Sequence, residues 1–93
     1  MEPEEISEGR WRVPARYSIV ELGELFDMEL EDEDVDSVGG LLAKAIGRVP
    51  LPGAIGEASG IRMVAEEARG RRRQVGTIVC SRVDSLGASN RQE

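Results

Sequence analysis

Two adjacent glycines, Gly39 and Gly40, precede a short apolar segment, and a glycine-rich helix start of this kind can cradle a phosphate. The free N–H groups of a helix start carry about half a positive charge. Leu41 and Leu42 follow directly, so the Lys-Ser/Thr ending of a P-loop is missing. Five full negative charges lie just upstream and outweigh the partial positive charge of the helix start. They belong to Glu31, Asp32, Glu33, Asp34 and Asp36. The glycine pair therefore favours close packing of a helix over capture of an anion.

The acidic run before the glycines could instead hold a cation. Asp32, Asp34 and Asp36 match positions 1, 3 and 5 of an EF-hand calcium loop. Position 6 of that loop should be glycine and is Ser37, and position 12 should be glutamate and is Ala43. We therefore predict a solvated acidic loop that binds Ca²⁺ or Mg²⁺ only weakly, in the millimolar range.

The composition removes most familiar catalytic chemistry. The 93 residues include no histidine and one cysteine, Cys80, so zinc sites of Cys and His and nucleophiles paired with His are unavailable. Cys80 lies in the apolar segment GTIVCSRV, which favours a buried thiol over a reactive one. No pair of carboxylates is marked out for acid–base catalysis. We expect a protein that is not an enzyme, with no catalytic, cofactor-binding or metal residues and no cofactor.

Charge is unevenly distributed along the chain, whose formal net charge is −6. Residues 21–36 carry nine acidic side chains and no basic one, whereas residues 69–73, RGRRR, carry four arginines. The acidic excess disfavours nucleic acid as a partner, because it would repel the phosphate backbone. We predict that the arginines form a solvated hairpin tip, with contact to anionic lipid headgroups, an acidic partner surface or phosphates as the alternatives.

The N-terminal half predicts a strand followed by two helices. RWRVPARYS alternates, and Pro14 confines this strand to an edge of a sheet or to a bulge. Apolar spacing predicts an amphipathic helix over residues 18–27 with Ser18 as its N-cap. A second helix is predicted from the N-cap Ser37 to Gly47, where a left-handed C-terminal residue belongs.

The C-terminal half reads as a three-stranded antiparallel meander made of AIGEASG, GIRMVAEEA and RQVGTIVCSRV. Apolar residues on both faces of the last segment predict an interior strand, and two exposed edges would allow weak pairing between chains. Residues 1–9 and 84–93 are polar and are predicted to be a flexible lead-in and a flexible tail. The sequence therefore predicts one small α+β domain over residues 10–83.

The span EDVDSVGGLLAKAIGRVPLPG…SGIRMVAEE…RRRQVGTIVCSRV resembles the transporter-associated domain, also called the CorC/HlyC domain. YSIVELGELFDMEL is similar to the first helix of that family, so the resemblance covers residues 10–83. Ser37 stands where the family more often has Thr, and Ala54 where it has Asp, but neither position has a known catalytic role. The remaining matching positions are Asp36, Gly40, Leu41, Leu42, Ile46, Gly47, Arg48, Val49, Pro50 and Gly53.

The resemblance implies a fold similar to a small subdomain of FAD-binding proteins, although no residue here indicates a flavin site. It implies a non-catalytic, C-terminal regulatory domain on the cytoplasmic side of a membrane ion transporter, of the magnesium and cobalt efflux or hemolysin-like type. The partners would be the transmembrane and CBS-pair domains of the parent protein, and the isolated fragment would be soluble. The alternative is a stand-alone small-molecule or nucleotide-binding module that uses the sheet face and the helix start at Val38–Gly40.

Overall fold

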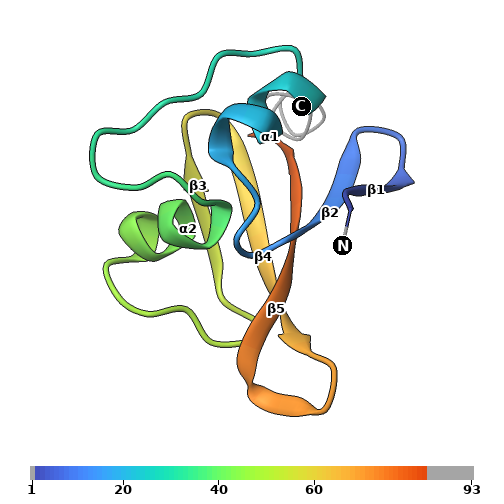
Figure 1. Cartoon of the computed structure of the whole chain (residues 1–93), viewed down its shortest axis with the longest axis vertical. Coiled ribbons are helices and arrows are strands. Elements are labelled where there is room, and N and C mark those ends of the chain that lie inside the picture. Colours follow the sequence, from blue (N-terminus) through green and yellow to red (C-terminus); the bar gives the residue numbers. More distant parts are fainter. Residues whose placement is uncertain (1, 84–93) are drawn as a thin grey trace, which may run out of the picture.

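Two helices cover one face of an antiparallel sheet in the computed structural model, which describes residues 2–83 (Figure 1). The sheet has the order β1-β2-β5-β4-β3. The helices α1 (Ile19–Leu25) and α2 (Val38–Ile46) connect β2 to β3. The strands are β1 (Glu4–Ser7), β2 (Arg10–Pro14), β3 (Ile55–Ala58), β4 (Ile61–Ala68) and β5 (Arg71–Arg82). The α+β class, the two helices and the C-terminal meander are confirmed.

The sequence did not predict β1. Residues 1–9 were expected to be a flexible lead-in, but β1 pairs antiparallel with β2, with Glu4 opposite Arg12 and Glu5 opposite Trp11. The prediction rested on side-chain polarity, whereas the pairing joins backbone N–H and C=O groups, which every residue except proline carries. The predicted tail, residues 84–93, lies outside the described residues.

The prediction that Pro14 confines its strand to a sheet edge or to a bulge was wrong, since β2 lies between β1 and β5 and its register with β5 continues without a shift through Pro14. Pro14 is the last residue of β2, and β1 pairs only as far as Arg12. The N–H of Ala15 donates to the carbonyl oxygen of Gly76 in β5, so the nitrogen of Pro14 faces the opposite side, beyond the end of β1. Pro14 has no N–H to donate, but no β1 residue lies on that side to accept a hydrogen bond, so the sheet loses no hydrogen bond there.

Residues with positive φ form the turns of the two C-terminal hairpins. Ser59 and Gly60 join β3 to β4 with φ of 53° and 82°, as a two-residue hairpin loop of type I′ requires. Gly70, at φ 75°, lies in the turn between β4 and β5. The resulting meander places β5 in the middle of the sheet, which confirms the predicted interior strand.

Both helices begin at the predicted serine caps. The hydroxyl of Ser18 accepts from the N–H of Val20 (3.1 Å), and that of Ser37 accepts from the N–H of Gly40 (3.0 Å). The first helix ends at Leu25, two residues earlier than predicted, and Gly47 closes the second helix at φ 77°. No helix within residues 2–83 combines the length and the apolar character needed to cross a bilayer.

The core lies between the helices and one face of the sheet. Alternation along β4 and β5 directs a row of apolar side chains toward the helices. The sheet residues buried there are Val13, Ile61, Met63, Ala65, Ile78 and Cys80, and the helical ones are Ile19, Leu22, Val38, Leu41 and Leu42. The opposite face of the sheet carries no helix in the described part of the chain.

Candidate functional site

The glycine pair at the start of α2 is closely packed, with Gly39 against the end of β2 and Gly40 against the loop before the helix. A methyl group on Gly39 would lie 2.9 Å from the carbonyl oxygen of Ala15, and one on Gly40 would lie 3.1 Å from the Cβ of Val35. The N–H groups of this helix start all have partners: that of Val38 donates to Tyr17 (2.8 Å) and that of Gly39 to Ala15 (2.7 Å). The N–H of Gly40 donates to the Ser37 hydroxyl. All three backbone N–H groups therefore bond within the domain, which agrees with the prediction that the glycine pair serves packing of the helix.

The acidic loop contacts a lysine from α2. The Nζ of Lys44 lies 2.9 Å from Oδ2 of Asp32 and 2.8 Å from Oδ2 of Asp34. Asp32 also accepts from the backbone N–H groups of Asp34 (2.8 Å) and Val35 (3.3 Å), which shapes the loop. The hydrogen bond from Lys44 lowers the pKa of Asp32, and its bonds to Asp34 and Asp32 raise the pKa of Lys44. Asp32 and Asp34, two of the three aspartates that match the EF-hand pattern, are thus already paired with the ammonium group of Lys44.

The three EF-hand-like aspartates do not come together as metal ligands in the described region. Within residues 2–83, no three or more Asp, Glu or Cys side chains gather closely enough to hold a metal ion. Asp36, the third EF-hand-like position, instead accepts through its backbone carbonyl from the N–H of Ile19 (3.1 Å). The three aspartates that the sequence spacing suggested as a set therefore do not form a metal-binding group in this part of the chain.

Cys80 is fully buried in the core. Burial raises the pKa of its thiol to about 12, because the apolar surroundings disfavour the thiolate. A thiol in this state is a poor nucleophile and a poor metal ligand at neutral pH. The side chain acts as a small apolar core residue, as predicted.

The face of the sheet without helices carries a hydrogen-bonded network that the sequence analysis missed. Arg12 donates to Glu66 from Nε (2.7 Å) and Nη2 (3.1 Å), and the hydroxyl of Thr77 donates to the same carboxylate (2.7 Å). The hydrogen bond from Arg12 has the largest effect and lowers the pKa of Glu66, and the bond from Thr77 lowers it further. Arg12 also reaches Glu4 at 3.4 Å. The network links strands β1, β2, β4 and β5 on one surface.

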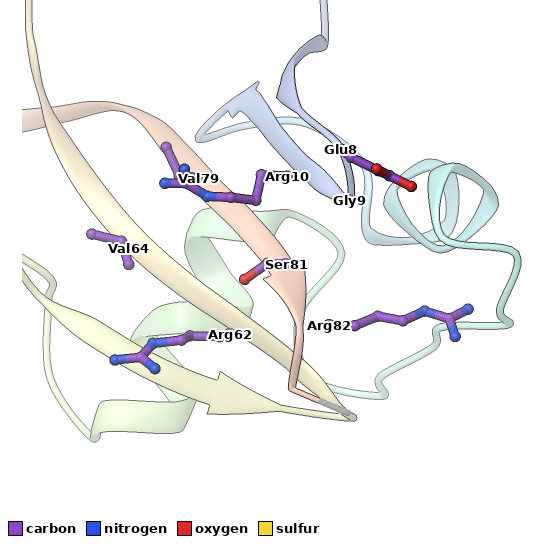
Figure 2. A pocket seen from close by; sticks show the side chains of 8 residues that line it. All are labelled: Glu8, Gly9, Arg10, Arg62, Val64, Val79, Ser81 and Arg82. Carbon is purple, nitrogen blue, oxygen red and sulfur yellow. The ribbon is translucent and has the colours of Figure 1, made fainter. Parts of the chain in front are cut away.

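Beside this network lies a hollow of about 360 Å³ (Figure 2). Arg10, Ser81 and Arg62 stand in register across β2, β5 and β4 and form a row along it. Figure 2 shows the side chains of Arg10 and Arg62 extending in the same direction on either side of Val64. The full lining is Glu8, Gly9, Arg10, Arg62, Val64, Val79, Ser81 and Arg82.

The third arginine of the lining faces elsewhere. Arg82 extends away from the hollow in Figure 2, and its Nη2 donates to the carbonyl oxygen of Phe26 at the end of α1. Strand alternation could have placed Arg10 with Arg12, and Arg62 with Val64, on common faces. It could not have brought the two pairs together, because that depends on the register of both strands with β5.

The arginine-rich segment 69–73 forms the exposed tip of the β4–β5 hairpin. Within this tip, the Nη1 of Arg71 donates a hydrogen bond to the side-chain oxygen of the nearby Gln74 (3.5 Å). The position agrees with the predicted solvated tip.

Comparison with known proteins identifies the family of this chain. The family model of the Transporter associated domain (CorC_HlyC) matches residues 4–79. A UPF0053 protein of Mycobacterium tuberculosis is 45% identical in an alignment 93 residues long, which covers 96% of this chain and 21% of that protein. The magnesium and cobalt efflux protein CorC of Escherichia coli K12 is 34% identical over 68 residues, covering 73% of this chain and 23% of CorC.

A crystal structure shows the same fold. A CorC-associated region from Neisseria meningitidis superposes with a TM-score of 0.73 and 28% identity, over 89% of this chain and 100% of that one. The present chain spans about a fifth of the length of the curated relatives it matches. Since the family model matches from residue 4 onward, it includes β1 as well as the helices and the meander. The chain belongs to the transporter-associated (CorC_HlyC) domain family.

Proposed function

We propose that this chain is a non-catalytic regulatory domain of a membrane ion transporter of the magnesium and cobalt efflux, hemolysin-like type. The observation that carries the proposal is its 34% identity to the E. coli magnesium and cobalt efflux protein over 73% of the chain. The chain corresponds to 23% of that protein, so the regions that transport ions would lie elsewhere in a longer polypeptide. In this proposal the domain modulates transport from the cytoplasmic side of the membrane.

The partners in this proposal are the other domains of the parent protein, namely its transmembrane region and its CBS pair. The geometry supports contact with protein over capture of a small ligand at the helix start. The amides of Val38, Gly39 and Gly40 already donate to groups within the domain. This arrangement counts against the alternative of a nucleotide-binding module that uses Val38–Gly40.

A transport assay tests the proposal. The full-length parent protein and a version lacking the domain would be reconstituted at equal amounts in vesicles, and Mg²⁺ and Co²⁺ efflux would be measured. We expect removal of the domain to change the rate of efflux or its dependence on ion concentration. Unchanged efflux would refute the regulatory role, and submillimolar binding of ATP, AMP or FAD by the 93-residue chain would favour the rival module.

We also propose that the acidic loop binds divalent cations only weakly. Lys44 already contacts Asp32 and Asp34, so an incoming cation must displace an ammonium group from both carboxylates. Calorimetric titration with Mg²⁺ and Ca²⁺ should give dissociation constants in the millimolar range. Micromolar affinity would contradict this proposal.

We also propose that the chain forms a weak homodimer through the edges of its sheet. The two edge strands of the sheet are β1 and β3, and β3 carries Ile55 with 51% of its surface exposed. Exposed edges of this kind can pair with another chain. Sedimentation equilibrium at increasing concentration should detect a weak dimer, and a strictly monomeric chain at millimolar concentration would exclude it.

A further inference from the structure

Two arginines on the helix-free face of the sheet are not held in an ion pair by any carboxylate of the described residues. Arg10 and Arg62 form no ion pair within residues 2–83, whereas Arg12 on the same face is held by Glu66 and Glu4. The contrast is informative because acidic residues outnumber basic ones by 18 to 12 in this chain. Glu8 also lines the hollow, but it forms no ion pair with either arginine in this part of the chain. Glu57 stands opposite Arg62 across β3 and β4, and the charge of Arg10 acts on Glu66, but no carboxylate of residues 2–83 lies within ion-pair distance of either arginine. Both guanidinium groups are therefore available to a partner.

An apolar strip runs beside the arginines. Val79, Val64 and Ile55 are neighbours across β5, β4 and β3, in the row next to that of Arg10 and Arg62. Val64 is half-buried and Ile55 is 51% exposed. In Figure 2 the two arginine side chains flank Val64. A partner that fits this surface would carry negative groups on both sides of an apolar one.

We propose that this face is a docking surface for an extended acidic segment of the longer protein, with carboxylates on Arg10 and Arg62 and an apolar side chain between them on Val64 and Val79. The inference rests on the proposed function, because it takes the partner to be another part of the same polypeptide. The chain is only 21% to 23% of the length of its relatives, so most of such a polypeptide lies outside this domain.

A segment with several carboxylates fits better than a single phosphate. One phosphate is bound most tightly when guanidinium groups converge on its oxygens. Here the two arginines stand on strands separated by β5, roughly 10 Å apart at two strand spacings, and extend side by side. Two separate carboxylates on one extended peptide can meet them without such convergence.

The test uses the 93-residue chain and a fluorescently labelled peptide of sequence EDLEDLE, with binding followed by fluorescence anisotropy. The double variant Arg10→Glu/Arg62→Glu should bind about tenfold more weakly or worse, since two attractive contacts become repulsive. The matched control is Arg71→Glu/Arg72→Glu at the hairpin tip, which changes the net charge equally and should stay within about threefold of the wild type. Thermal unfolding of each variant verifies that it is folded.

Several outcomes would overturn the docking surface. These are an absence of saturable peptide binding, an equal loss of affinity in the hairpin-tip control, and binding of a QNLQNLQ peptide as tight as that of EDLEDLE. Arginine-dependent binding to phosphatidylserine vesicles or to inorganic phosphate, without peptide binding, would reassign the surface to those ligands. The result is separable from the regulatory role. Failure of domain removal to alter efflux refutes that role whatever the peptide does, and loss of peptide binding leaves an efflux effect standing.

Discussion

The ammonium group of Lys44 lies 3.0 Å from Oδ1 and 2.9 Å from Oδ2 of Asp32, so a lysine from α2 occupies the acidic loop that precedes the helix. A second carboxylate, that of Asp34, receives the same group at 2.8 Å. The loop that looks most like a cation site in the sequence is thus partly neutralised by the domain itself. Lys44 sits in the last turn of α2, where a positive charge also favours the helix dipole.

Replacing the lysine should expose the acidic loop to cations. In Lys44→Met the two aspartates lose their ammonium partner, and we expect the affinity for Ca²⁺ and Mg²⁺ to rise by about tenfold, because the competing charge is removed. Lys44→Arg keeps the charge and serves as the control. Isothermal titration calorimetry measures the dissociation constants, and equal weak binding by all three proteins would contradict the competition.

The glycine pair should respond unequally to added methyl groups. Gly39→Ala places a Cβ 2.9 Å from a backbone carbonyl, that of Ala15, which cannot move without shifting the strand end. We expect a loss of about 1–3 kcal/mol in the free energy of unfolding. Gly40→Ala meets the Ser37 hydroxyl and the Val35 side chain at 3.1 Å. Its cost should be smaller, because these neighbours are side chains that can shift slightly, whereas the gain in helix propensity of up to about 1 kcal/mol applies to both variants.

Urea unfolding at neutral pH measures both alanine variants. If Gly39→Ala proved as stable as the wild type, the close approach of α2 to the end of β2 would not be what requires glycine there. A larger loss in Gly40→Ala than in Gly39→Ala would likewise contradict the geometry.

Glu66 should make stability depend on acid pH. Its pKa is lowered in the folded state, first by the hydrogen bond from Arg12, so its stabilising effect is complete above the ordinary value of about 4.3. That effect is lost as the pH falls through the lower, folded pKa. We expect the gap in melting temperature between the wild type and Glu66→Gln to be widest near pH 7 and to narrow as the pH falls below about 4.3.

Circular dichroism melts at intervals between pH 7 and pH 3 provide the measurement. Glu67→Gln, on the next residue of β4 and exposed, is the matched control and should show little gap at any pH. A gap for Glu66→Gln that persists unchanged at pH 3 would show that the charge of this carboxylate does not carry the effect.

Cys80 should react only after unfolding. Its side chain is fully buried, and burial raises its pKa to about 12, so neither access nor thiolate is available in the native domain. At pH 8 we expect a thiol reagent such as dithionitrobenzoate to modify the protein at the rate of unfolding, and at once in denaturing urea. Immediate stoichiometric labelling of the native protein would refute the buried position.

The sequence by itself determined the features that depend on neighbouring residues. The serine caps Ser18 and Ser37, the left-handed Gly47 and the turn at Ser59 and Gly60 all follow from local backbone and hydrogen-bonding preferences. Alternation in the C-terminal strands predicted the meander and its central strand, because side chains point to opposite faces at every second residue. The family resemblance rested on these same local motifs, and the match over residues 4–79 confirmed it.

Only the tertiary structure decided which distant residues meet. The polar strand β1 forms because the backbone of β2 has an edge to pair, and no pattern in its side chains signals this. Lys44 reaches Asp32 because α2 folds back along the loop, and Arg10, Ser81 and Arg62 align because three strands adopt one register. Register depends on the fit of the whole core, and a shift of one residue would move every side chain to the other face.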